Sequence, residues 1–116
     1  MKWILATALL CATAAQALPV RIEIGEAVFL PQAEVDIRRN LRTLSTPPFT
    51  VVMQPPDIAD FAAFTHGRVG QDMRVFVCDT VVFAPKLLTV IENGQIFIHT
   101  AMANGRLEAF TTQGCP

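Results

Sequence analysis

Few side chains in this 116-residue sequence could take part in chemistry, and two cysteines are the strongest candidates. Cys78 and Cys115 could form a disulfide, bind zinc together with His66 and His99, or act in thiol redox chemistry. No two of these four residues stand at the short spacing typical of zinc ligands, and the chain has no C-x-x-C motif. The spacing therefore favours a disulfide, and we expect no metal and no cofactor.

Two carboxylates, Asp57 and Asp60, form the remaining pair that could serve acid–base catalysis. Both stand at the start of a predicted helix, where they are more simply partners of the helix dipole. His66 falls in the last turn of that helix and His99 on a strand, and we expect both at the surface. The sequence has no Ser/His/Asp cluster, Gly-rich phosphate loop or nucleophile motif, so we expect no catalytic residues and no enzymatic activity.

Residues 1–17 have the layout of a secretory signal peptide. One cation, Lys2, precedes an apolar stretch. The stretch closes with Ala15-Gln16-Ala17, a small-x-small pattern that predicts a cleavage site between Ala17 and Leu18. An uncleaved membrane anchor is the alternative, although polar residues interrupt the run of about 20 apolar residues that a span needs. A lipoprotein is disfavoured because large residues precede Cys11. We expect a periplasmic or secreted protein.

Removing 17 of the 116 residues leaves 99, the length of a single domain over residues 18–116. Lys2 leaves with the signal peptide, so nine Lys and Arg become eight against ten Asp and Glu, a net charge of about −2. This balance gives no indication of nucleic acid or an anionic membrane as partner. The remaining chain contains neither Trp nor Tyr, so it is poorly supplied with aromatic platforms for sugars.

A disulfide fits an exported protein because the compartments beyond the cytoplasmic membrane are oxidising. Once Cys11 has left with the signal peptide, Cys78 and Cys115 remain as an even pair. Their bridge would close a loop of about 36 residues and would stabilise the fold by roughly 3 to 4 kcal/mol.

Short alternating segments predict strands in the first half of the domain. Residues 20–30 indicate a strand or hairpin that bends at Gly25, and residues 49–53 a strand between two Pro-Pro pairs. Residues 34–44 fit neither the helical nor the strand period, and their arginines indicate a solvated basic face.

Residues 56–66 form the best-supported helix. Pro56 suits a first helical turn, and Gly67 can supply a left-handed C-terminal cap. One side of the segment is apolar at helical spacing. That side consists of Ile58, Phe61, Ala62 and Thr65.

Residues 74–98 predict two hairpins. The first has Asp79-Thr80 at its tip and its second strand ended by Pro85, while the second turns at Asn93-Gly94. Residues 95–100 alternate as a strand, and the tail that follows indicates one or two helical turns. Strands flanking one good helix predict an α+β fold with a small, mainly antiparallel sheet.

One ordered set of residues runs from the predicted helix to the last predicted strand. It consists of Phe61, Phe64, Thr65, Val69, Gly70, Asp79, Val81, Val82, Ala84, Pro85, Ile91, Gly94, Gln95 and Ile96. The set resembles the head of the first periplasmic domain of SecD, a membrane component of bacterial protein export. In that head a Phe-containing helix ends in Thr and is followed by Val-Gly, a strand, an Asp-Gly turn, Val-Val-x-Ala-Pro and a Gly-rich turn before Gln-Ile. The resemblance covers residues 49–100.

Three departures limit what this resemblance implies. Thr80 stands where the family usually has glycine, so we expect a turn of a type other than I′ or a turn with a bulge. We also expect Thr80→Gly to be neutral or mildly stabilising. The family's C-terminal helix is replaced by a shorter, less apolar tail, for which the disulfide would compensate. No segment matches the transmembrane helices of SecD, which couple proton flow to export, so we expect a freestanding secreted head domain.

The resemblance implies a non-enzymatic periplasmic module that binds exported or unfolded polypeptide, or components of the export machinery, through an exposed edge strand. The alternative is a small secreted inhibitor or structural subunit stabilised by its disulfide. The sequence does not indicate the identity of the partner, the oligomeric state, or which edge strand is exposed.

Overall fold

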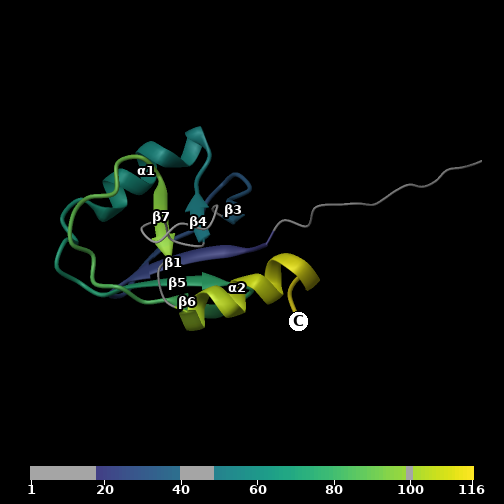
Figure 1. Ribbon diagram of the computed structural model, residues 1–116. Helices are drawn as coiled ribbons and strands as arrows, with labels where there is room; N and C mark the ends of the chain where they lie inside the picture. Colours follow the sequence, from purple (N-terminus) through teal and green to yellow (C-terminus); the bar gives the residue numbers. More distant parts are fainter. Residues whose placement is uncertain (1–17, 40–48, 99–100) are drawn as a thin grey trace, which may run out of the picture.

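The computed structural model describes residues 18–39, 49–98 and 101–116, which form seven strands and two helices (Figure 1). The predicted α+β class is confirmed, and the named strands pair antiparallel throughout. They form two sheets rather than one. The elements are β1 (Val20–Ile24), β2 (Ala27–Phe29), β3 (Asp36–Arg39), β4 (Phe49–Val52), α1 (Pro55–Thr65), β5 (Met73–Val77), β6 (Thr80–Phe83), β7 (Gln95–Ile98) and α2 (Ala101–Gln113).

The larger sheet has four strands in the order β2-β1-β5-β6. Its β1–β2 hairpin bends at Gly25 as predicted, and the φ of +60° at this position suits glycine. Ile22 and Ile24 are buried, whereas Arg21 and Glu23 lie on the opposite, partly exposed face, because successive side chains of a strand alternate.

The smaller sheet has the order β3-β4-β7 and lies across the larger one (Figure 1). The ambiguous segment 34–44 contains β3, and its residues 40–44 lie outside the described residues. Phe49 pairs with Ile98 and Val52 with Gln95, so β7 lies at one edge of this sheet.

The core lies between the two sheets and beneath α1. Its buried apolar side chains come from all the elements except β2 and β3. They are Ile22, Ile24, Val35, Phe49, Val51, Met53, Phe61, Met73, Val75, Val77, Val82, Leu87, Ile96, Ile98 and Leu107. The strand members occupy alternate positions, which is why each strand has one apolar and one more polar side.

The helix predicted over residues 56–66 is confirmed as α1, with Pro55 in its first turn. Phe61 is fully buried and its ring packs 5.0 Å from that of Phe29 and 6.1 Å from that of Phe64, between centroids. Gly67 has a φ of +85°, as expected for a left-handed residue just beyond the helix.

The β5–β6 hairpin confirms a turn in the predicted region but shifts it by one residue. Val77 pairs with Thr80, so the tip is Cys78-Asp79, and Thr80 begins β6 instead of forming the turn. Both tip residues have positive φ, 53° and 61°, which is the signature of a type I′ turn. The expectation of another turn type was therefore wrong, whereas the alternative expectation of a bulge agrees with the register shift between Val75 and Phe76 in this hairpin.

This register reverses the expectation for Thr80→Gly. The change would remove a β-branched side chain from a paired strand position, together with the 3.3 Å hydrogen bond that Thr80 Oγ1 donates to the Cys78 carbonyl. We expect the free energy of unfolding to fall by about 1 kcal/mol, because glycine is unfavourable within strands. Urea denaturation of the oxidised protein measures this loss. An unchanged or raised stability would indicate that the tip lies at Asp79-Thr80 after all.

The hairpin predicted at Asn93-Gly94 is wrong. Gly94 has a φ of +70°, and the Asn93 side-chain oxygen accepts a 3.0 Å hydrogen bond from the Gln95 amide, so the chain does turn here. However, β7 pairs with β4, and none of residues 84–94 pairs with it. The turn is specified by local residues, whereas the strand with which β7 pairs depends on contacts across the whole fold.

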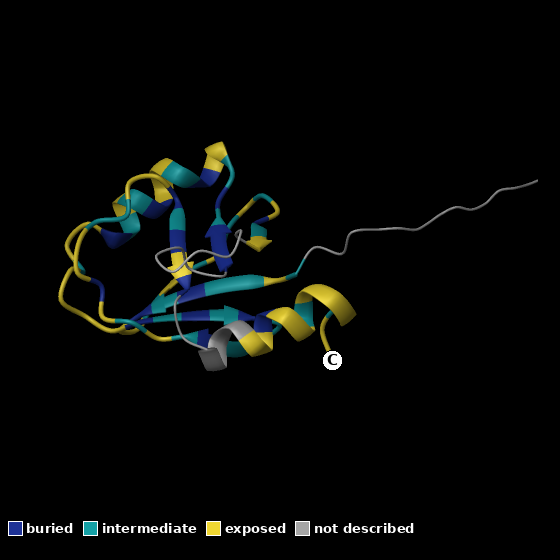
Figure 2. Ribbon diagram, in the orientation of Figure 1, coloured by how far each residue is buried: buried dark blue, intermediate teal, exposed yellow. Residues whose placement is uncertain are grey.

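The tail forms a longer helix than the one or two turns predicted, since α2 has 13 residues. Leu107 is fully buried, and Arg106 donates a 2.8 Å hydrogen bond to the Val81 carbonyl of β6. Most of the other described side chains of α2 are exposed (Figure 2). The predicted disulfide between Cys78 and Cys115 is present, and it ties the end of this helix to the β5–β6 turn.

Candidate functional site

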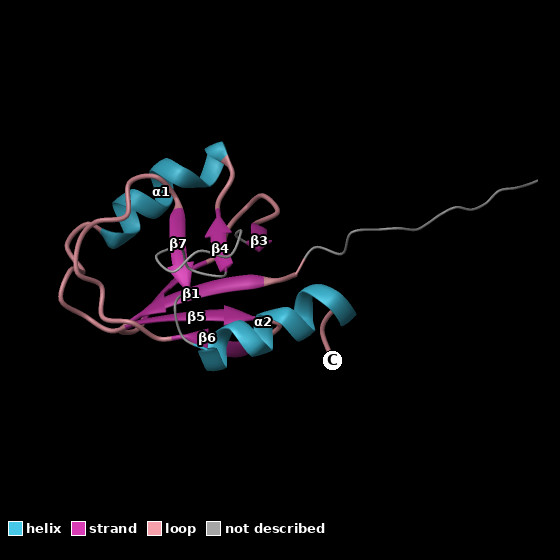
Figure 3. Ribbon diagram, viewed as in Figure 1, coloured by secondary structure: helices cyan, strands magenta, loops and turns pink. Residues whose placement is uncertain are grey.

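A groove of about 810 Å³ lies between β7 and the chain that leads to it. We call residues 84–94 the strap, because they connect β6 to β7 without forming a named strand (Figure 3). The groove is lined by strap residues 85–93 together with Met73, Phe83, Gln95, Ile96 and Phe97. We refer to it as the β7 groove. Its volume is in the upper part of the range of ligand-binding clefts.

The first half of the strap is held by main-chain hydrogen bonds to the chain before β5. The Met73 amide donates to the Pro85 carbonyl at 2.8 Å, and the Leu87 amide to the Gln71 carbonyl at 2.8 Å. The Gly70 amide donates in turn to the Leu87 carbonyl at 2.7 Å. These bonds explain why two loops far apart in sequence lie side by side (Figure 3).

The second half of the strap is held by α1 and β4. The buried Thr65 hydroxyl accepts a 3.1 Å hydrogen bond from the Ile91 amide and donates one of 3.0 Å to the Ala62 carbonyl. The Gly94 carbonyl accepts from the Met53 amide at 2.9 Å. The strap is thus fixed at both ends, and one wall of the β7 groove is preorganised.

The outer edge of β7 supplies the groove's main-chain groups. Met53 and Gly94 form a hydrogen-bonded pair of the antiparallel β4–β7 ladder, because the Met53 amide donates to the Gly94 carbonyl. Hydrogen-bonded and non-hydrogen-bonded pairs alternate along such a ladder. The main-chain groups of Gln95 and Phe97 therefore point outward, away from β4. The Asn93 side chain already accepts from the Gln95 amide. Within residues 18–39, 49–98 and 101–116, the Phe97 amide has no hydrogen-bond acceptor, and no strand pairs with this edge.

Two other sheet edges are protected. The β6 edge is covered by α2, whose Arg106 binds the Val81 carbonyl. The β3 edge is short and carries Asp36, Arg38 and Arg39, and such charges discourage strand addition. β7 has four residues, as β3 and β6 have, but its edge differs from theirs because it faces an apolar groove.

Comparisons of the chain with protein-family models, with curated proteins and with solved structures found no match. The resemblance to the SecD head therefore stays a prediction made from the residues. Function has to be argued from the geometry of the fold.

The residues of the SecD-like pattern mostly maintain the strap and its supports. Five residues of this set lie in the strap or in the elements that support it: Phe61, Thr65, Gly70, Pro85 and Gly94. A methyl group added to Gly94 would lie 2.9 Å from Ile58 Cγ1, so this position has no room for a side chain. Three further residues of the set, Val69, Asp79 and Ala84, are exposed. The pattern thus specifies the frame of the β7 groove rather than a set of reactive groups.

Asp57 has a role that the sequence did not reveal. Its carboxylate is buried, and its two oxygens accept hydrogen bonds of 2.9 Å from the Gln32 and Ala33 amides. It therefore does more than interact with the helix dipole, because it fixes the loop after β2 against the start of α1. Asp60 is exposed, so the two carboxylates occupy different surroundings.

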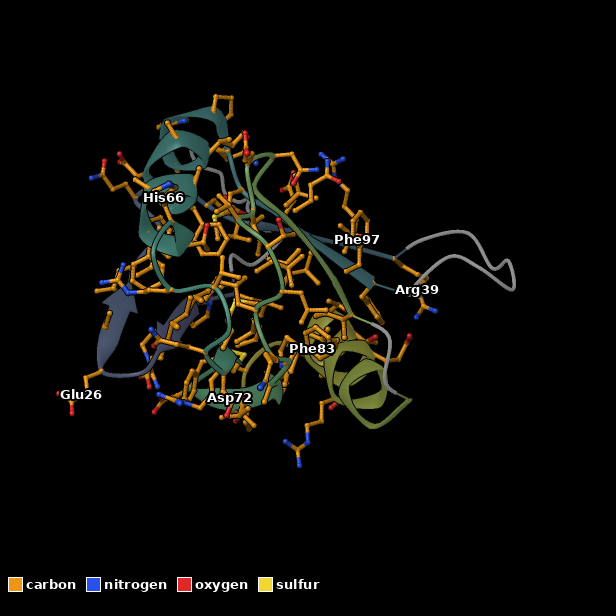
Figure 4. The ribbon with its side chains drawn as sticks, turned by 90° about the vertical axis from the view of Figure 1, so that its left-hand side faces the viewer. Glu26, Arg39, His66, Asp72, Phe83 and Phe97 are labelled. Atoms are coloured by element: carbon orange, nitrogen blue, oxygen red, sulfur yellow. A yellow bond between two sulfur atoms is a disulfide. The ribbon has the colours of Figure 1, made fainter. Side chains whose placement is uncertain are left out.

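The structure places one of the two histidines. His66 is exposed at the end of α1, well separated from Phe83 and Phe97 (Figure 4). His99 lies outside the described residues. In the described part of the chain, no three His, Cys, Asp or Glu side chains are grouped so that they could hold a metal ion. Among the same residues, no helix has both the length and the apolar character needed to cross a membrane.

The charged groups of the larger sheet form a surface network away from the β7 groove. Arg74 Nη2 lies 3.0 Å and Arg21 Nε 2.9 Å from the Glu23 carboxylate, and Arg21 also binds Asp79 at 2.8 Å. The hydrogen bond from Arg74, followed by that from Arg21, lowers the pKa of Glu23. The hydrogen bond to Asp79 raises the pKa of Arg21. The positive charges of the two arginines are matched by the negative charges of Glu23 and Asp79. The network is therefore a solvated face of the sheet rather than an anion-binding patch.

Proposed function

We propose that this chain is a non-enzymatic binding module that holds extended, apolar polypeptide along the outer edge of β7. The observation that carries the proposal is the combination of a strand edge with which no described strand pairs and an adjoining apolar groove. An open edge recognises an extended main chain, because it offers the hydrogen bonds of a neighbouring strand. The groove favours apolar side chains on that strand.

The size of β7 sets the expected strength of binding. Its four residues span about 13 Å, so an added strand pairs over about four residues. Each main-chain hydrogen bond contributes about 0.5–1.5 kcal/mol net, and few groups point outward. The expected affinity is therefore weak, roughly in the high micromolar range.

The resemblance to the SecD head supports the same function, because that domain meets unfolded polypeptide during export. It also agrees with the predicted signal peptide and with a disulfide, which persists in oxidising compartments. We therefore propose that the protein acts in the periplasm or is secreted, as a freestanding SecD-like head. The partner would be exported polypeptide, with no cofactor and no turnover.

Titration with permanently unfolded polypeptide tests the proposal. Reduced, carboxymethylated α-lactalbumin carrying a fluorescent label is a suitable probe, since residues 18–116 contain no Trp. We expect saturable binding whose dissociation constant changes less than threefold between 50 and 500 mM salt, because the groove is apolar. The bound probe should be recovered intact.

Two results would contradict this function. One is the absence of binding at high micromolar protein concentration. The other is a single enzyme recovered from periplasmic extract in a tight one-to-one complex, which would favour the alternative of a secreted inhibitor or structural subunit.

A further inference from the structure

We propose that the β7 groove selects polypeptide segments by the period of their side chains: apolar residues at alternate positions, with no ionised side chain among them. This inference rests on the proposed function and specifies its ligand. The main-chain bonds accept any sequence, whereas the groove discriminates between the two faces of the bound strand.

The pleat of β7 determines which side chains of a bound strand enter the groove. Ile96 is buried, whereas Phe97 is 44% exposed, so the two faces of β7 have different surroundings. An added strand continues the same pleat, and its side chains would alternate between these two faces. Every second side chain would therefore lie on the Ile96 side, above the floor of the groove.

The floor of the groove is apolar, and the rim is more exposed. Met73, Leu87 and Ile96 line the groove and are buried, whereas Leu88 is 79% exposed at its rim. An apolar side chain entering between them would contact carbon atoms and leave water. The removal of such a side chain from water favours binding.

An ionised side chain on the same face would have no partner on this floor. Among the described residues that line the groove, two are ionisable, Lys86 and Glu92, which have opposite charge and are both exposed. A charge entering the apolar floor would lose its hydration without gaining an ion pair, and this is strongly unfavourable. On the opposite face, where Phe97 is 44% exposed, the same charge would keep more of its hydration and cost less.

The length of β7 limits the motif to two groove-facing positions. Four strand residues present two side chains to each face. The selected segment is thus about five residues long, with apolar side chains at its second and fourth positions.

A series of capped pentapeptides of matched composition tests this inference by displacement of labelled, carboxymethylated α-lactalbumin from the full protein. The reference peptide is Ac-Thr-Val-Thr-Val-Thr-NH₂, and its control, Ac-Val-Val-Thr-Thr-Thr-NH₂, has the same residues without alternation. We expect the control to bind at least fivefold more weakly. Glutamate in place of the fourth residue of the reference peptide should weaken binding at least tenfold, and in place of the third less than threefold.

The outcomes separate this inference from the function on which it rests. Equal losses for glutamate at the third and fourth positions, or equal affinity for the two matched peptides, would overturn the selection by period while leaving polypeptide binding intact. Displacement by none of the peptides from a protein that binds the unfolded probe would place binding outside the β7 groove and would also overturn it. Failure of the unfolded probe itself to bind would refute the proposed function.

Discussion

Replacing both Cys78 and Cys115 with serine should lower the free energy of unfolding by about 3 to 4 kcal/mol. The disulfide joins residues 37 positions apart, and releasing a loop of this length returns about that much conformational entropy to the unfolded chain. Removing a native disulfide from a small domain costs about 2–5 kcal/mol in general. Urea denaturation of the oxidised protein and of the double serine variant gives the difference directly.

The structure also predicts which part of the double serine variant loses the most stability. Among the described side chains of α2, Leu107 is fully buried in the core and Phe110 is partly buried. Without the bridge, α2 should separate from β6 well before α1 unfolds, since α1 is held by the fully buried Phe61. Hydrogen exchange should then show faster exchange in residues 105–113 and little change in residues 58–65.

Reduction of the unmodified protein with a dithiol provides the matched control, because it removes the same bridge without changing the sequence. It should reproduce both effects. A stability loss below about 1 kcal/mol, or unchanged protection of α2, would show that packing alone holds this helix.

Asp57→Asn should destabilise the fold by about 2 to 4 kcal/mol although it preserves the shape of the side chain. The carboxylate accepts from two main-chain amides, those of Gln32 and Ala33. An asparagine would accept one of these bonds and direct its own N–H groups toward the other donor. A buried amide left without an acceptor costs about 1–3 kcal/mol, and bonds to a charged acceptor are stronger than neutral ones.

Asp60→Asn is the control for this prediction. It changes the same charge in the same helix, three residues later, but its side chain is exposed. We expect its free energy of unfolding to stay within about 0.5 kcal/mol of the parent. Equal stabilities for the two variants would mean that Asp57 contributes only through its charge at the start of α1.

Elements with strong local signals could be predicted from the sequence. The helix α1 has a proline at its start, a glycine after its end and an apolar face, and it was found within one residue at each end. The β1–β2 hairpin and β4 were found for similar reasons, since their alternation and turn residues are local properties. The disulfide followed from the number of cysteines rather than from geometry.

Elements that depend on distant partners could not be predicted. The Asn93-Gly94 turn indicated a local hairpin, but β7 pairs with β4, which lies more than 40 residues earlier. The full length of α2 was missed because its sequence has little amphipathic pattern, and Leu107 alone of its described residues is fully buried. The β5–β6 tip was misplaced because Cys78 takes a positive φ that its residue type does not indicate.

The candidate site could be anticipated only in part. An exposed edge strand within residues 74–98 was expected, but the sequence could not say which strand it was. That depends on the sheet order, which places β5 in the interior, brings α2 over β6, and leaves β7 at an edge beside the strap.

The most direct test of binding along β7 compares the affinity of labelled, carboxymethylated α-lactalbumin for two variants at one position, Phe97→Pro and Phe97→Val. Both remove the aromatic ring, but only proline removes the outward amide, and the bonds between β4 and β7 are kept in each case. Matched thermal unfolding of the two variants confirms that both are folded. Binding along this edge predicts at least tenfold weaker binding by the proline variant than by the valine variant, whereas equal affinities would contradict it.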